Sequence, residues 1–246
     1  MRIDVDGRLI DVHVRVSSRA KKMRITIRPL RPPEVVVPAR TSRDTLRRFL
    51  DETRDWIGRE VARAEAVANQ PSSLGLDMPG VVWLAGHPVR VQRELAGRAS
   101  ARLTTTNVLI VSGPSARHGA AIERWYRRAA RRQLTQTVRD EARRLGLTWA
   151  SIGIRDPRTR WGSCSHRWHL SFSWRLVLAP TAVLRYVAIH ELCHLVEHNH
   201  SKAFWKTLDT AEPSWRESAH WLREHGHELH RYELARALLP FGTTQD

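Results

Sequence analysis

Near the start of the chain, apolar residues alternate with polar ones at the two-residue period of a half-buried β-strand. The alternation runs through residues 10–16, and a second apolar and polar alternation follows at 23–27 after a polar turn. Two such runs joined by a turn predict a β-hairpin. Thr41 or Ser42 then caps a helix, because the apolar residues that follow recur mostly at intervals of three and four.

Turn-forming residues interrupt the pattern at 69–80, where two prolines and two glycines predict a linker or a long loop. Short strands are expected at 81–84, 89–92, 102–105 and 108–111, and then a long helix over about 116–145 that Gly146 ends. Two further strands, at 148–154 and 169–174, give a small sheet for a later helix to pack on. We therefore expect an α+β fold, with a β-rich region containing one long helix over 1–114 and a helical domain with a small sheet over 115–246.

The segment 183–196 is apolar nearly all round, which is typical of a buried helix, and Pro180 suits its first turn. His190 and His194 project about 40° apart on such a helix, so both imidazoles can reach one metal ion, whereas Glu191 lies about 100° from His190. Buried polar side chains are costly without a partner, and a metal ion supplies one. This is the H-E-x-x-H arrangement of zinc-dependent hydrolases, and this composition produces it by chance only about 0.04 times per chain.

A catalytic zinc needs a third protein ligand and one open coordination position. His200 follows His194 after five residues, and Asn199 tolerates the left-handed conformation that ends helices, so the chain could turn back there and aim His200 at the metal. The spacing equals that of the metzincins, but Glu197 stands where they have Gly, and no Met follows for a Met-turn. Spacing alone leaves three alternatives for this ligand: His198, Glu212 and Glu217.

Several motifs in one fixed order resemble the YgjP-like metallopeptidase family. They are R-W-G-S-C-S at 160–165, S-W-R-L-V-L-A-P at 173–180, H-E-L-C-H at 190–194, N-H-S at 199–201 and F-W at 204–205. The resemblance is continuous over about 155–210, and upstream only the β-rich pattern is similar. Members of this family are small zinc-dependent hydrolases of the zincin type, more distantly related to the SprT and WLM proteases.

The resemblance implies a zincin-like domain in which His190, His194 and His200 bind Zn²⁺ and Glu191 is the general base. Family members usually carry Asn in the strand before Trp174, whereas this chain has serines, at positions 171 and 173.

The segment 161–165 is expected to form an edge strand beside the site, where an extended peptide can pair through backbone hydrogen bonds. The candidate substrate-binding residues are Arg160, Trp161, Gly162, Ser163 and Cys164. Cys164 and Cys193 are expected to be small packed residues rather than ligands. The tryptophans that flank the site are expected to belong to the core rather than to a stacking platform: Trp161, Trp174 and Trp205.

Composition and charge limit the function further. Two cysteines favour a reducing compartment, and neither a signal peptide nor an apolar run of membrane-spanning length is visible, so a cytoplasmic protein is expected. The net charge of +16 invites a nucleic-acid partner, but only four of the 41 basic residues are Lys, an imbalance that genome-wide composition bias also produces. Five arginines share one predicted helix, where such a run is usually a solvated face: Arg124, Arg127, Arg128, Arg131 and Arg132.

Four histidines near the C-terminus suggest a second metal cluster, but position 231 is Arg where a further His would be required. The sequence therefore favours a solvated helix end for His220, His225, His227 and His230.

Together these features predict a zinc-dependent metallopeptidase in which Glu191 takes a proton from a metal-activated water that attacks a peptide carbonyl. One alternative is metal-dependent nucleoside triphosphate pyrophosphohydrolysis, an activity also associated with the resembled family. That chemistry normally prefers oxygen-ligated magnesium, which three imidazoles serve poorly. A third possibility, from a different class, is a DNA-associated protease similar to the SprT and WLM proteins.

Overall fold

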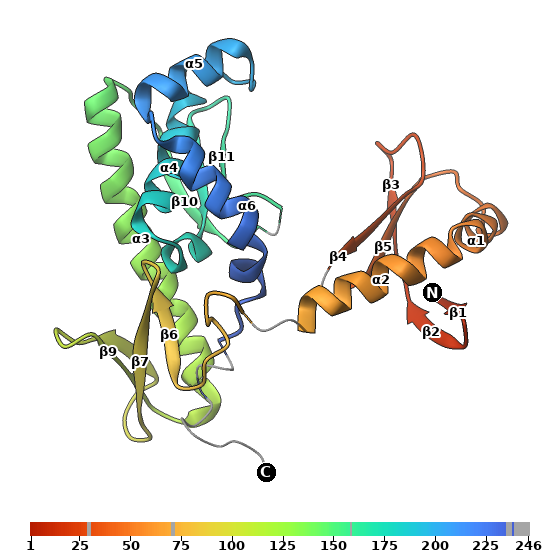
Figure 1. The fold of residues 1–246 in the computed structure, drawn as a ribbon, viewed down its shortest axis with the longest axis horizontal. Helices are drawn as coiled ribbons and strands as arrows, with labels where there is room; N and C mark the ends of the chain where they lie inside the picture. The colour runs from red at the N-terminus through yellow and green to blue at the C-terminus, as the bar shows by residue number, and fades with distance from the viewer. Residues whose placement is uncertain (29–30, 70–71, 158, 235–237, 239–246) are drawn as a thin grey trace. The chain divides into compact units, whose positions relative to one another are not determined.

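The computed structural model describes residues 1–28, 31–69, 72–157, 159–234 and 238. The chain forms two compact units, Met1–Pro71 and Ser72–Asp246, each with its own hydrophobic core (Figure 1). The boundary lies inside the stretch 69–80, which the sequence predicted as a linker or long loop. The sequence pattern placed the division at 114/115, but the strands between 81 and 112 share the core of the second unit.

The first unit contains two small sheets. Strands β1 (Arg2–Val5) and β2 (Arg8–Asp11) form an antiparallel pair. In the second sheet, β5 (Arg31–Pro38) lies between β3 (His13–Ser17) and β4 (Arg24–Arg28), parallel to β3 and antiparallel to β4. The hairpin predicted from residues 10–16 and 23–27 is therefore wrong, because a later strand takes the hydrogen bonds that the two runs would have exchanged.

Two helices complete the first unit, α1 (Arg43–Glu52) and α2 (Arg54–Asn69), where one long helix was expected. Ser42 is the N-cap of α1, and its side chain accepts a hydrogen bond from the Thr45 backbone N–H at 3.1 Å. Thr53 separates the helices, and its hydroxyl donates to the Phe49 carbonyl. The apolar faces of these helices and of β5 make the core of this unit, with Val35, Leu50 and Ile57 fully buried.

The second unit begins with a four-stranded sheet in the order β6-β7-β9-β8. Its strands are β6 (Val81–Leu84), β7 (His87–Glu94), β8 (Ser100–Leu103) and β9 (Val108–Ser112). The turn between β6 and β7 has positive φ at Ala85 and Gly86. The backbone N–H groups of both donate to carbonyls of the segment just before helix α4 (Thr181–Cys193), those of Val177 and Leu178. The sheet is thereby joined to the part of the chain that carries the candidate site.

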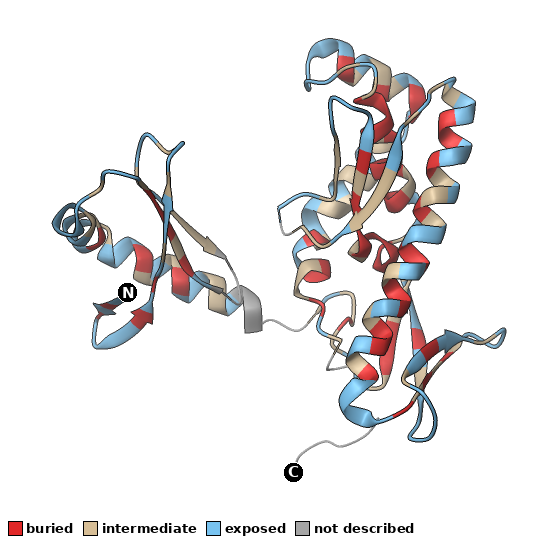
Figure 2. Cartoon of the chain, turned by 180° about the vertical axis from the view of Figure 1, so that it is seen from behind, coloured by how far each residue is buried: buried red, intermediate tan, exposed pale blue. Residues whose placement is uncertain are grey.

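A short 3-10 helix, η1 (Ser115–Arg117), leads into the 28-residue helix α3 (His118–Leu145). Gly146 ends α3 in the left-handed conformation, at φ 68°, as the sequence predicted. Buried and exposed residues alternate along α3, the long helix at the right of Figure 2. Its buried face packs against both sheets of the unit and against α4.

The arginines on α3 make contacts within the second unit. Arg124, Arg128 and Arg131 donate to backbone carbonyls of the neighbouring strand segments, at 3.3–3.5 Å, and Arg127 forms an ion pair with Glu123 at 2.7 Å. Four of the five arginines that the sequence grouped together therefore have partners in their own unit.

The remaining elements surround the candidate site. A three-stranded sheet has the order β10-β12-β11, from β10 (Ser151–Arg155), β11 (Gly162–Cys164) and β12 (His169–Ser173). After it come η2 (Trp174–Leu178), α4 (Thr181–Cys193), α5 (Lys202–Ala211) and α6 (Trp215–Arg231). The fold is mixed α+β, as predicted. Within the described residues, no helix combines the length and the apolar character needed to cross a membrane.

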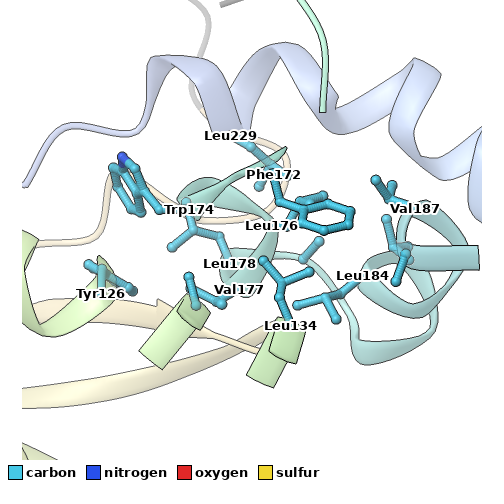
Figure 3. Packing of buried hydrophobic residues seen from close by; sticks show 14 of the residues in the cluster. Tyr126, Leu134, Phe172, Trp174, Leu176, Val177, Leu178, Leu184, Val187 and Leu229 are labelled. Carbon is cyan, nitrogen blue, oxygen red and sulfur yellow. The ribbon is translucent and has the colours of Figure 1, made fainter. Parts of the chain in front are cut away.

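The core beneath α4 is made of large side chains from four segments of the chain. Figure 3 shows Leu134 of α3, Phe172 of β12 and Leu184 of α4 packed together beside the residues of η2. All three are fully buried. Burying a Leu or Phe side chain stabilises a fold by about 1.5–3 kcal/mol, so this packing holds α4 rigidly at the centre of the unit.

An ion-pair network links α4 to its neighbours. Arg185 of α4 pairs with Glu141 of α3 and with Glu212, the C-cap of α5. Arg144 also pairs with Glu141, at 2.7 Å, and donates to the Ala211 carbonyl. Glu141 and Glu212 are both buried, so each carboxylate is paired, as buried charges must be.

Candidate metal centre

Helix α4 carries the H-E-x-x-H motif in its last turn. Pro180 is the N-cap of the helix rather than its first residue, and His194 is its C-cap. Nine residues of the helix are buried, in agreement with the predicted apolar surface. His190 and His194 therefore lie one turn apart on a helix whose position the core fixes.

The chain after α4 turns back through backbone hydrogen bonds. The N–H groups of Val196 and Glu197 both donate to the Cys193 carbonyl. The left-handed residue expected at Asn199 is absent, since the positive-φ residues that are not glycine, within the described residues, lie elsewhere. Consecutive helical turns reverse the chain instead, and Ser201 then caps α5 by accepting from the Phe204 N–H at 3.3 Å.

This turn brings His200 to the two helix histidines. The Nε2 atoms of His200 and His190 are 3.1 Å apart. One ring nitrogen from each of His190, His194 and His200 lies within 4.8 Å of the other two, so the cluster could hold a metal ion. Nitrogens bound to one tetrahedral zinc are about 3.3 Å apart, so small side-chain adjustments suffice.

His190 and His194 have lowered pKa values, which favour the neutral imidazole that binds a metal ion. Burial, together with the neighbouring His194 and His200, lowers the pKa of His190 to about 3. Burial also lowers the pKa of His194, although its hydrogen bond with the Glu197 carbonyl opposes this. Both imidazoles are neutral at pH 7, as metal ligands must be. The contact of His194 Nδ1 with that carbonyl, at 2.9 Å, leaves Nε2 free to face the cluster.

Aromatic rings surround the three imidazoles. Phe204 contacts all three rings, with centroids 4.5–5.0 Å apart, and Trp205 lies 5.6 Å from the His200 ring. Trp205 in turn stacks on Trp215 at 5.1 Å. His190 Nδ1 is buried without a hydrogen-bond partner among the described residues, so aromatic packing surrounds this side of the ring.

Glu191 lies beside the cluster and against the backbone of β11. It is 5% exposed. A Cβ atom added at Gly162 would stand 2.5 Å from Glu191 Oε1, closer than any real contact. Burial raises the pKa of Glu191 to about 8, while the positive charge of Arg160 acts in the opposite direction. A cation at the histidines would also lower this pKa, because it favours the charged carboxylate.

A cavity of about 390 Å³ joins these groups. The three histidines and Glu191 line it, as do all five residues that the sequence proposed for substrate binding: Arg160, Trp161, Gly162, Ser163 and Cys164. Within the described residues, strand β11 is an edge of its sheet, because it pairs with β12 alone. Burial and the charge of Glu191 raise the pKa of Cys164 to about 11, and among the described residues Cys164 is not part of the group arranged to hold a metal.

The alternatives to His200 lie outside the cluster. His198 lines the cavity, but its ring packs edge-to-face on His166 at 4.7 Å. Glu212 forms the ion pair with Arg185, and Glu217 is exposed on α6. Among the described residues, the group arranged to hold a metal consists of the three histidines.

The cavity is also lined by residues that the sequence analysis did not assign to the site, namely Tyr186, Val187 and Leu222. Tyr186 lies four residues before His190, and this spacing could have identified it, because it shares a helix face with that ligand. Leu222 comes from α6, and nothing local in the sequence marks it. Of the flanking tryptophans, Trp174 is fully in the core, whereas Trp161 also lines the cavity and stacks on His230 at 4.2 Å.

Comparison with known proteins identifies the family of the chain. The family model described as "YgjP-like, metallopeptidase domain" matches residues 21–225. The match includes the whole three-histidine cluster, Glu191 and the strand β11. No curated protein matches the chain.

Proposed function

Because the chain belongs to the YgjP-like metallopeptidase family, we propose that it is a zinc-dependent peptidase in which Glu191 is the general base. The family implies a metal ion and protein substrates. The observation that carries the finer proposal is the convergence of three histidine side chains and one buried carboxyl group on a single cavity. Zinc accepts three imidazole ligands and leaves a fourth position open.

The three histidines would hold the zinc ion. When bound, zinc acts as a Lewis acid, which makes water more acidic and polarises a carbonyl group. His190 and His194 supply rigid ligands from α4, and His200 closes the site from the loop before α5. Glu191 belongs to the same helix turn but projects toward β11, and this direction supports a role in proton transfer rather than in metal binding.

Strand β11 supplies a place for the substrate backbone. Its edge lies along the cavity, so an extended peptide can add to the sheet through main-chain hydrogen bonds. Main-chain pairing selects no particular side chain, and this suits a peptidase of broad specificity. Gly162 brings the strand directly against Glu191, so a peptide bound along the strand would pass the carboxyl group.

The test uses the full chain, stripped of metal with a chelator and then reconstituted separately with Zn²⁺ and Mg²⁺. We expect one equivalent of zinc to bind and to restore cleavage of a casein substrate, with no hydrolysis of nucleoside triphosphates. Magnesium-dependent release of pyrophosphate without casein cleavage would instead establish the nucleotide-hydrolysing alternative. Casein cleavage that requires added DNA would establish the DNA-associated alternative.

A further inference from the structure

Tyr186 is a cavity-lining residue of α4 one turn before His190. Its ring meets the His190 ring edge-to-face, with centroids 5.9 Å apart. It also stacks on Trp215, at 6.2 Å and with 15° between the ring planes. The residue is 9% exposed, so two aromatic neighbours hold the ring in one position at the wall of the cavity.

The hydroxyl group of Tyr186 is unused. The chain has three tyrosines, and the other two contact each other through their hydroxyl groups at 3.2 Å, where Tyr126 also donates to the Trp83 carbonyl at 2.6 Å. Tyr186 has no such partner within the described residues. The hydroxyl is not among the fully buried polar atoms that lack a partner, so it is open to solvent, and a ligand that enters the cavity can accept a hydrogen bond from it.

Helix geometry places Tyr186 and Glu191 on opposite sides of His190. Four residues back along the helix, Tyr186 projects about 40° to one side, whereas Glu191 projects about 100° to the other. Glu191 lies against β11. A peptide carbonyl bound beside the histidines therefore has the carboxyl group on its β11 side and the phenol on the other.

We propose that Tyr186 is a further catalytic residue, whose hydroxyl donates a hydrogen bond to the carbonyl oxygen of the peptide bond being cleaved. The proposal rests on the proposed peptidase function and adds a residue that the H-E-x-x-H motif does not assign. A donor aimed at an oxygen that becomes negative stabilises the transition state more than the bound substrate.

In the proposed hydrolysis, Tyr186 gains and loses no proton. A water oxygen bonds to the carbonyl carbon, one water proton passes to Glu191, and the π electron pair of the carbonyl moves onto its oxygen. Tyr186 donates to that oxygen and keeps its proton. The electron pair then re-forms the carbonyl, the C–N bond breaks, and Glu191 gives its proton to the leaving amine. The second water proton leaves with the new carboxyl group.

The test is Tyr186→Phe in the zinc-loaded full chain, because this change removes the hydroxyl and keeps both ring contacts. We expect kcat to fall by a factor on the order of 10² with KM unchanged. The zinc affinity of the metal-free protein should not change. A phosphinic peptide, which imitates the tetrahedral carbon, should bind more weakly in calorimetry by a similar factor, whereas a cleavage-product peptide should bind as before. Tyr232→Phe removes a hydroxyl outside the cavity and is the matched control.

The possible outcomes are distinct. Full kcat and full phosphinic-peptide affinity in Tyr186→Phe would overturn the proposal, and so would a loss of zinc, which would mean that Tyr186 only supports His190. Equal losses in Tyr232→Phe would also overturn it, by showing a general effect on the core. A wild-type protein that cleaves no peptide would refute the proposed function itself, whereas an active wild type with an unaffected Tyr186→Phe would refute only this role.

Discussion

At the scale of single residues, the proposed chemistry depends on Glu191, a buried carboxyl group one position after a metal-ligand candidate. Its carboxyl group lies at β11 and not among the three clustered ring nitrogens. Removing its basicity should therefore leave the metal in place.

The first prediction concerns Glu191→Gln. This variant keeps the size and polarity of the side chain but cannot accept a proton, so we expect peptide hydrolysis to fall by a factor on the order of 10² or more. Zinc content, measured by metal analysis, and the circular dichroism spectrum should match those of the wild type. Loss of zinc together with activity would show that Glu191 is a ligand or holds the site together.

The second prediction concerns the contact between β11 and Glu191. A methyl group at Gly162 would overlap the Glu191 side chain, at 2.5–2.8 Å from three of its atoms. We expect Gly162→Ala to displace the carboxyl group and to lower kcat by roughly tenfold or more, because a misplaced base loses its alignment. Zinc affinity should be unchanged.

The matched control for this prediction is Gly153→Ala in the same sheet. An added Cβ there meets its nearest atom at 3.7 Å, an ordinary van der Waals contact. This variant should keep full activity. If the two variants behave alike, the close approach of Gly162 to Glu191 has no catalytic importance.

At the scale of elements, the site depends on how the turn after α4 delivers a third histidine. The third prediction compares His200→Ala with His198→Ala. His200 belongs to the cluster and His198 does not, although both line the cavity. We expect the first change to weaken zinc binding roughly tenfold or more, measured by competition with a chelator, because it removes a ligand. The second should leave zinc affinity unchanged. The reverse order of effects would reassign the third ligand.

Another element-scale feature is the attachment of α6 to the start of the second unit through Glu228. Its carboxylate accepts hydrogen bonds from the Ser72 and Ser73 hydroxyls and from the Leu74 N–H. Burial by itself raises the pKa of Glu228, but these hydrogen bonds outweigh it and hold the pKa at about 2, below the ordinary value of 4.5.

The fourth prediction follows from this shift. A carboxyl group whose pKa is lower in the folded protein contributes stability above pH 4.5, and the contribution disappears as the pH falls from 4.5 toward 2. We expect wild type to have a higher Tm than Glu228→Gln at pH 6, and the difference to shrink below pH 4.5. Thermal unfolding of the metal-free proteins across this range measures it. A difference that is independent of pH would show that the carboxylate charge contributes nothing.

At the scale of the whole molecule, the high positive charge raises the question of nucleic acid. The net charge is +16, but four of the five arginines grouped on α3 bond to carbonyls or to a carboxylate of their own unit. Partners within the fold reduce what these side chains can offer to phosphates.

The fifth prediction is that nucleic-acid binding is weak and non-specific. We expect the affinity for duplex DNA to fall with salt at a log–log slope of about −0.9 per neutralised phosphate and to vanish near physiological salt. A fluorescence-anisotropy titration at several salt concentrations measures this. Tight binding that survives at physiological salt would instead support a DNA-associated protease.

The sequence by itself determined the features that depend on neighbouring residues. Helix periodicity over a short stretch of sequence predicted helix α4. It also predicted that the helix carries two histidines one turn apart, with Glu191 to one side of them. Most strands and the end of α3 at Gly146 also follow from local pattern. His200 was identified from its spacing together with the family motif, although the turn that delivers it does not use Asn199 as expected.

Only the tertiary structure decided which distant segments meet. Strand β5 lies between β3 and β4, and the chain divides at 71/72. Both features depend on contacts between separate segments, which an alternating pattern does not encode. The same holds for the site. Gly162 touches Glu191 across 29 residues of chain, and Leu222 reaches the cavity from α6. Local periodicity specifies which face of an element is buried, and only close packing specifies what it is buried against.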